Sequence, residues 1–265
     1  RNTQSRKCSW REAWPAAQGL RSDEGFVVSQ VLKRSPQVVA LSETALNKGI
    51  YTPAEAARLC RARTDAVTRW VFGDARTEPV VEAELAHQRR IITFADLVQA
   101  MAIRYLRTYY EVPLPTIREA IKIARRDYQV DRPLAYKHEI SIFDREIFIK
   151  VPTLDGQLTG VSGADRHQHP IRQIVEPLMR HVSFDDNWLA SMVTLHPHAD
   201  YPVVIDPTRR MGQPIIQGLN ILADVLAMSV KAEGSYQAAA DVHDVDIDAV
   251  YSAFDFYQSY SGTAK

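Results

Sequence analysis

The pattern of apolar and polar positions predicts a chain built mainly of helices, with a few short strands between them. Apolar residues recur at every third or fourth position across 93–110, the spacing of one face of a helix. Similar spacing predicts further helices over 26–47, from 116 onwards, over 171–182 and near 222–233, 236–241 and 246–258. Asp246 is expected to cap the last of these, whose buried stripe would consist of Ile247, Val250, Phe254 and Tyr257.

Two segments have the composition of strands. Residues 138–151 contain two β-type runs joined by Asp144-Arg145, which predicts a hairpin. Residues 203–205 predict a strand that ends in a turn at Asp206-Pro207. The expected fold class is therefore α+β: mainly α with small β hairpins. A hairpin that follows helices is also what a winged helix requires.

Residues 49–73 predict two short helices joined by a tight turn. Thr52 and Glu55 form a capping box with Pro53 in the first helical position. A second capping box is expected at Thr116 and Glu119, and Thr64 is expected to cap the second helix of the 49–73 pair. The cations left outside this pair are Arg61, Arg63 and Arg69. This is the pattern of a helix-turn-helix, whose second helix enters a DNA groove. The alternative is a helical hairpin with a solvated basic face.

Charge is divided unevenly between the two halves of the chain. The full sequence has 32 basic and 32 acidic residues, but residues 1–150 carry a net charge of +7 and residues 151–265 one of −7. A basic half suits a polyanionic partner, and it is the half that holds the helix-turn-helix pattern. The apolar runs are too short to span a bilayer, and no signal-peptide pattern is found. Two cysteines without metal-ligand spacing favour the cytoplasm.

Candidate chemistry is sparse. Two His-x-His pairs, His167 with His169 and His196 with His198, are potential metal ligands, but no further ligand spacing completes a site. The aspartates between 241 and 248 lack the alternation of a calcium loop, and no phosphate-binding loop or nucleophile motif is present. We therefore expect no catalytic residues, no metal and no cofactor. Four segments are predicted: a tail and lead helix at 1–48, a DNA-binding domain at 49–155, a connecting segment at 156–200 and a small helical module at 201–260.

Two regions of the chain resemble one family. The segment GIYTPAEAARLCRARTDAVTRWVFG is similar to MerR-like helix-turn-helix segments. The segment PVVIDPTRRMGQPIIQGLNI, with the helices after it, looks like a small antitoxin module once described as a domain of unknown function. The module's pattern falls on Asp206, Pro207, Gly212, Pro214 and Gly218. The central part of VapB-type antitoxins is also similar to three segments between them, ITFADLVQAMAIRYLR, PTIREAIKIARR and QIVEPL. The resemblance therefore spans about 49–258.

This resemblance implies a dimeric type II antitoxin in the cytoplasm. Its N-terminal part would repress its own operon by binding operator DNA, and its C-terminal part would neutralise a PIN-domain ribonuclease toxin encoded by a neighbouring gene. The expected DNA-binding residues are Arg61, Arg63, Thr64, Thr68 and Arg69. The chain departs from the family in its long N-terminal lead and in Gly218-Leu219-Asn220, where Gly-Thr-Arg is usual. Any toxin contact or salt bridge made by that arginine is therefore in question.

Two other functions stay open at this point. A MerR-like transcription regulator would use its C-terminal module to bind a ligand or another protein, with no toxin partner. A hydrolase would use the histidine pairs together with an aspartate. A neighbouring gene for a PIN-like toxin would distinguish the antitoxin from the regulator, and a bound metal would point to the hydrolase.

Overall fold

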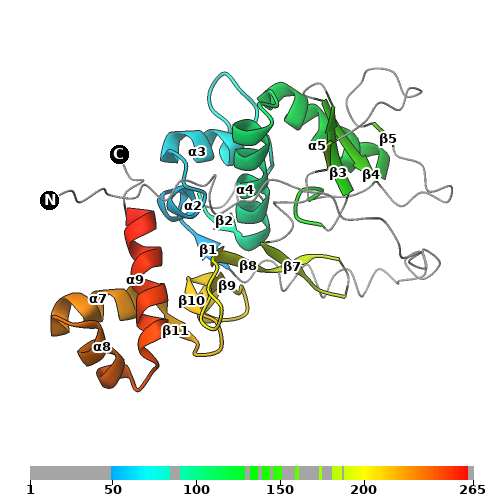
Figure 1. The fold of residues 1–265 in the computed structure, drawn as a ribbon. Coiled ribbons are helices and arrows are strands. Elements are labelled where there is room, and N and C mark those ends of the chain that lie inside the picture. Colours follow the sequence, from blue (N-terminus) through cyan, green and yellow to red (C-terminus); the bar gives the residue numbers. More distant parts are fainter. Residues whose placement is uncertain are drawn as a thin grey trace, which may run out of the picture. The chain divides into compact units, whose positions relative to one another are not determined.

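The computed structural model describes residues 49–83, 90–128, 132–136, 139–143, 146–150, 159–160, 173–174, 181–186 and 188–261. All of them belong to one compact unit, Ser35–Lys265. Helices and short strands are mixed within it, which confirms the α+β class (Figure 1). The predicted tail and the helix at 26–47 lie outside the described residues, as do Asp144, Arg145, His167 and His169.

The first described part of the chain has a pair of short strands, each leading directly into a helix. Strand β1 (Ile50–Tyr51) pairs antiparallel with β2 (Ile92–Thr93). Helix α2 (Pro53–Leu59) follows β1, and α3 (Thr64–Phe72) follows α2. Helix α4 (Phe94–Tyr109) follows β2 and confirms the helix predicted over 93–110, and α5 (Leu114–Tyr128) comes next.

Capping boxes explain where α2 and α4 begin. The Thr52 hydroxyl accepts from the Glu55 N–H, the Glu55 carboxylate accepts from the Thr52 N–H, and Pro53 occupies the first turn, all as predicted. An equivalent box that was not predicted joins Thr93 to Asp96 at the start of α4. Both of its residues are buried, so the box also satisfies polar groups that water does not reach.

Two predicted caps are wrong. The N-cap of α3 is Arg63, whose backbone is extended and whose side chain makes no capping bond, and Thr64 is the first helical residue. Helix α5 begins at Leu114, so Thr116 lies within its first turn and does not cap it. Proline is tolerated in a first helical turn because the N–H groups there have no intrahelical acceptor. Pro115 therefore does not stop α5 from starting early.

The predicted hairpin after the helices is present. Strands β3 (Glu139–Phe143) and β4 (Glu146–Lys150) pair antiparallel, with Phe143 opposite Glu146 at the turn. Strands β5 (Thr159–Gly160) and β6 (Gln173–Ile174) extend them to a sheet of order β5-β4-β3-β6. The helix predicted over 171–182 is wrong at two places, because Gln173–Ile174 pairs with β3 and β7 starts at Val182.

The last part of the chain is less purely helical than the predicted small helical module. It holds a sheet of order β11-β10-β9-β8-β7, whose strands are β7 (Val182–Phe184), β8 (Ala190–His196), β9 (Val203–Ile205), β10 (Ile215–Ile216) and β11 (Ile221–Leu222). A short 3-10 turn, η2 (Arg210–Gly212), separates β9 from β10. The strand predicted at 203–205 is confirmed, but its neighbour β8 lies before residue 201.

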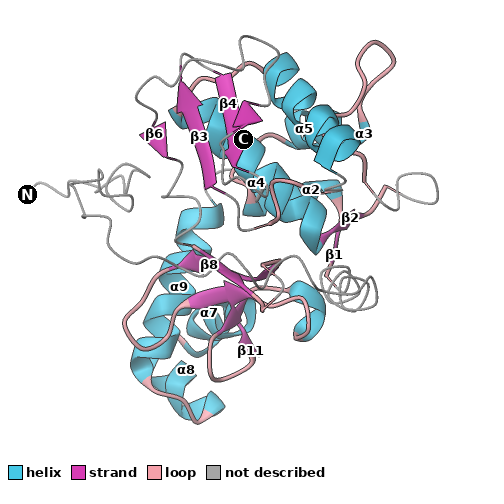
Figure 2. Ribbon diagram, turned by 90° about the vertical axis from the view of Figure 1, so that its right-hand side faces the viewer, coloured by secondary structure: helices cyan, strands magenta, loops and turns pink. Residues whose placement is uncertain are grey.

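Three helices close the chain, as predicted: α7 (Ala223–Glu233), α8 (Tyr236–His243) and α9 (Ile247–Ser261) (Figure 2). The Asp246 carboxylate accepts from the Asp248 N–H at 2.8 Å, which agrees with its predicted capping role. Helix α9 contacts α7, α8, β8, β9 and also α2. Val250 is buried as predicted, but Phe254 and Tyr257 are only half-buried, and the large buried side chains are Phe256 and Tyr260. Packing against all of these elements shifts the buried face of α9 away from the predicted stripe.

Candidate nucleic-acid interface

Helices α2 and α3 form the predicted helix pair around a tight turn. Their buried faces consist of Ala56, Ala57 and Leu59 on α2 and of Val67, Trp70 and Val71 on α3. Small residues on α2 let the two helices approach each other closely. The turn between them closes through a hydrogen bond from the Ala62 N–H to the Ala57 carbonyl, and Arg61 takes a left-handed conformation with φ of 48°. Core packing therefore orients α3 and leaves its opposite face in solvent.

The exposed face of α3 presents two arginines with a carboxylate between them. The side chains of Arg63 and Arg69 are 80% and 58% exposed. Asp65 Oδ1 lies 3.0 Å from Arg63 Nε, and its Oδ2 lies 3.7 Å from Arg69 Nη2. The hydrogen bond from Arg63 lowers the pKa of the Asp65 carboxyl below its usual value. Both guanidinium groups still have donors available, so this face can meet phosphates or base edges.

Two predicted threonines lie on the same helix. Thr64 is exposed and is the first residue of α3. Backbone N–H groups at the start of a helix can donate hydrogen bonds to a bound anion. Thr68 is half-buried, and its hydroxyl donates to the Thr64 carbonyl at 2.7 Å. That hydroxyl oxygen can still accept a hydrogen bond, for example from a base amino group. Arg63, Thr64, Thr68 and Arg69 thus share one helix and its N-cap, and we call them the α3 face.

A tight turn directly after α3 adds a further cation that was not among the predicted site residues. Asp74 and Thr77 exchange backbone hydrogen bonds, and the Asp74 carboxylate accepts from the Arg76 N–H at 2.8 Å. Gly73 precedes the turn with φ of 70°, and a Cβ there would lie 2.6 Å from the Thr77 carbonyl oxygen. Arg76 is exposed within this turn. The sequence signal was an aspartate followed three residues later by threonine, a common local turn pattern.

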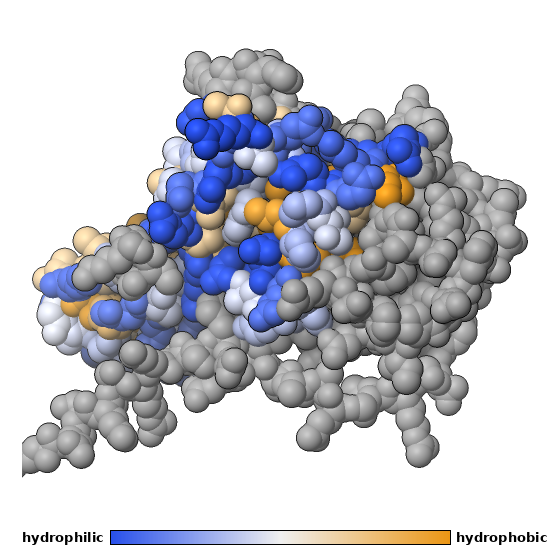
Figure 3. Space-filling model, turned by 90° about the horizontal axis from the view of Figure 1, so that it is seen from above, coloured by the Kyte–Doolittle hydropathy of each residue, from blue (hydrophilic) through white to orange (hydrophobic). Residues whose placement is uncertain are grey.

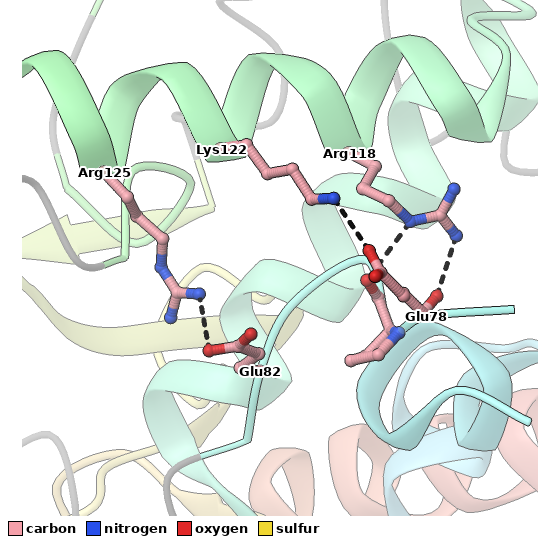
Figure 4. A network of polar contacts seen from close by, with 6 residues as sticks. Glu78, Glu82, Arg118, Lys122 and Arg125 are labelled. Atoms are coloured by element: carbon pink, nitrogen blue, oxygen red, sulfur yellow. Dashed lines mark hydrogen bonds and ion pairs between the residues drawn. The ribbon is translucent and has the colours of Figure 1, made fainter.

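The basic residues of α5 bind a neighbouring segment of the protein itself, as Figure 4 shows. Arg118 donates to the backbone carbonyls of Glu78 and Pro79 at 2.9 and 3.2 Å. Lys122 Nζ lies 2.7 Å from Glu78 Oε2, and Arg125 Nη1 lies 3.1 Å from Glu82 Oε2. These contacts fix the segment that leads away from α3. They engage these three cations of α5 within the protein itself. Where it is described, the face seen from above in Figure 3 is mostly hydrophilic.

Arg61 occupies a different environment from the α3 face. Its guanidinium lies over the ring of Tyr260, 4.2 Å from the centroid, and Nη2 is 3.2 Å from Ser259 Oγ. Its carbonyl accepts from Arg104 Nε at 3.3 Å. Arg61 is half-buried, so the expectation that it points outward with Arg63 and Arg69 is wrong. Whether Arg61 also contacts DNA stays a prediction.

The residues of the C-terminal motif shape turns. Asp206 accepts from the Thr208 N–H and hydroxyl at 2.8 and 2.6 Å, and Arg209 pairs with it at 3.3 Å. Pro207 and Pro214 are buried.

The two glycines of the motif lie in turns with left-handed backbone. Gly212 and Gly218 have φ of 77° and 88°, which favour glycine. The Gly212 carbonyl accepts from the Tyr51 hydroxyl at 2.7 Å, which places the motif against β1. Any role of these residues in binding a toxin stays a prediction.

The described histidine pair does not resemble a metal site. His198 Nδ1 accepts from the N–H groups of Asp200 and Tyr201 at 3.3 and 3.1 Å, which fixes the loop after β8. Burial lowers the pKa of His196. Among the described residues, no group of three or more histidine, cysteine or acidic side chains is arranged to hold a metal ion. None of the described helices is long and apolar enough to cross a bilayer.

Comparisons with known proteins give similarity both in sequence and in fold. An 89-residue stretch is 39% identical to "Putative antitoxin VapB45" of Mycobacterium tuberculosis and covers 33% of this chain. The chain spans only 37% of that protein's length. The crystal structure of Rv2018 from the same organism aligns over 77% of this chain and 97% of its own, with a TM-score of 0.53 and 21% identity, a likeness of fold alone. No protein-family model matches the chain.

Proposed function

We propose that this protein is an antitoxin that also represses its own operon. The observation that carries the antitoxin role is the 39% identity to a VapB antitoxin over 89 residues. The proposed partner is a PIN-type ribonuclease toxin, and the proposed site of action is the cytoplasm. The function is one of binding, with no catalytic step of its own.

The repressor part of the proposal rests on the α3 face. A short helix pair with a packed interior supports one helix whose outer side carries Arg63, Thr64, Thr68 and Arg69. In a helix-turn-helix, residues near the start of the second helix reach base edges and flanking cations contact phosphates. A homodimer would bring two such faces to two half-sites about 34 Å apart, one turn of DNA.

Co-expression with the product of a neighbouring gene tests the antitoxin role. We expect the full chain to copurify with that product in a fixed ratio and to suppress its ribonuclease activity. Recovery of free, active ribonuclease beside the folded chain would contradict the proposal. Specific DNA binding without any protein partner would then favour a transcription regulator with a ligand-binding module.

The α3 face is tested by the double variant Arg63→Ala, Arg69→Ala. We expect binding to DNA from upstream of the gene to weaken at least about tenfold, because two phosphate or base contacts are lost. The slope of log affinity against log salt should fall by about 0.9 for each phosphate contact removed. The matched control is Lys122→Ala, which removes a cation that binds Glu78. Unchanged affinity together with an unchanged slope in the double variant would count against the α3 face.

A further inference from the structure

The contact between the α2–α3 turn and the end of α9 links the proposed DNA-binding part to the C-terminal module. Arg61 lies in that turn, three residues before α3 begins at Thr64. Its guanidinium packs on the Tyr260 ring and hydrogen-bonds Ser259, 198 residues away in the sequence. A stacked and hydrogen-bonded arginine fixes its own backbone, and here that backbone is the turn that aims α3.

Tyr260 is itself firmly held. It is 2% exposed, its hydroxyl donates to the Leu195 carbonyl of β8 at 3.4 Å, and its ring packs on Phe256 at 4.4 Å. The surface that receives Arg61 is therefore built by α9 and β8 together. A shift of α9 against β8 would move the Tyr260 ring and the arginine stacked on it.

Two more contacts connect the same regions. Arg58 Nη1 on α2 lies 3.5 Å from Asp224 Oδ2 at the start of α7. The Tyr51 hydroxyl on β1 donates to the Gly212 carbonyl at 2.7 Å. The helix pair thus meets the C-terminal part at α7 and at α9, and β1 meets it at the η2 turn. The contact at α9 is the one that lies on the turn before α3.

We propose that Arg61 is a positioning residue, through which α9 holds the α2–α3 turn and sets the orientation of the α3 face. It acts on DNA binding through Tyr260 and Ser259. A partner that binds the C-terminal module and shifts α9 would change DNA affinity, and DNA would change affinity for that partner by the same factor. The inference rests on the proposed function for its consequence, but the holding of the turn by α9 is independent of it.

The test compares Arg61→Ala with Ser259→Ala and Tyr260→Leu in the full chain. If Arg61 acts by position, all three variants weaken DNA binding, by about fivefold or more for Arg61→Ala, with the salt slope unchanged. The Arg61→Ala, Tyr260→Leu double variant should be no weaker than the worse single variant, because both remove one contact. If Arg61 contacts phosphate directly, Arg61→Ala lowers the slope by about 0.9 and the α9 variants bind normally, which would overturn the inference.

Hydrogen exchange gives a readout that needs no DNA. We expect the amides of residues 60–68 to exchange faster in Arg61→Ala and Ser259→Ala, while those of α4 are unchanged. The control is Lys231→Ala. It removes a different cation–ring contact of α9, in which Lys231 Nζ of α7 lies 4.2 Å from the centroid of the Tyr257 ring. Unchanged exchange at residues 60–68 in both Arg61→Ala and Ser259→Ala would refute the inference that α9 fixes the α2–α3 turn. This outcome does not depend on whether Tyr260→Leu folds. If the wild-type chain bound no DNA, the proposed function would fail while exchange still decided this inference.

Discussion

At the scale of single residues, Gly212 shows why the η2 turn packs against β1. Its φ is 77°, and a Cβ at this position would lie 2.2 Å from the Tyr51 hydroxyl oxygen. Its carbonyl also accepts the hydrogen bond of that hydroxyl. Burial raises the pKa of the Tyr51 phenol, in keeping with a neutral donor in a dry contact. Glycine is thus required here for conformation and for close approach together.

The two requirements can be separated by comparing Gly212→Ala with Gly234→Ala. Gly234 has φ of 76°, but no atom lies within 4 Å of the place that a Cβ would take, so its substitution costs only the left-handed conformation, about 1 kcal/mol. Gly212→Ala adds a collision and should cost about 1–3 kcal/mol more. Denaturant unfolding of both variants measures this difference. Equal losses of unfolding free energy in Gly212→Ala and Gly234→Ala would show that the Tyr51 side chain moves aside without a measurable loss of stability.

Among the helices, a threonine followed three residues later by an acidic residue caps α4 but does not cap α5. Thr93 is buried, and its hydroxyl pairs with the Asp96 carboxylate at 2.8 Å. Thr116 is followed by glutamate three residues later, yet α5 has already begun at Leu114. The same sequence pattern therefore has different energetic meaning at the two positions.

We expect Thr93→Ala to lower the free energy of unfolding by about 1–2 kcal/mol, since the N-cap bond is lost and a buried carboxylate loses a donor. Thr116→Ala should be neutral or slightly stabilising, because Thr116 caps no helix and alanine has the higher helix propensity. Thermal unfolding monitored by circular dichroism measures both. A loss at Thr116 as large as that at Thr93 would contradict the assignment of the α5 start.

At the scale of the whole molecule, the C-terminal part depends on residues that precede its sequence motif. Strand β9 pairs with β8, Val204 opposite Thr194, and α9 packs on both strands. A module cut at 201 would lose β8, leaving an unpaired strand edge and exposing the α9 side chains that face it. The predicted boundary at 201 follows the resemblance, whereas the sheet continues upstream of it to β7.

We therefore expect a fragment of residues 181–265 to be more stable and more soluble than one of residues 201–265. The longer fragment retains β7 and β8 beside β9, although both lack the contact with Tyr51. Size-exclusion chromatography and circular dichroism of the two fragments measure the difference. A cooperatively folded, monomeric 201–265 fragment would show that β8 contributes little.

Local features could be predicted from the sequence, because they depend on neighbouring residues. They are the Thr52 capping box, the α2–α3 pair, the helix over 93–110, the β3–β4 hairpin and the three final helices. The side chains of α9 that are buried follow from its tertiary packing, since the helix contacts α7, α8, β8, β9 and α2 at once. Tertiary packing also placed Arg61 on Tyr260, a contact between residues 199 positions apart that no local pattern encodes. The division of the basic residues between the α3 face, the α5 network and the α9 contact follows from that packing alone.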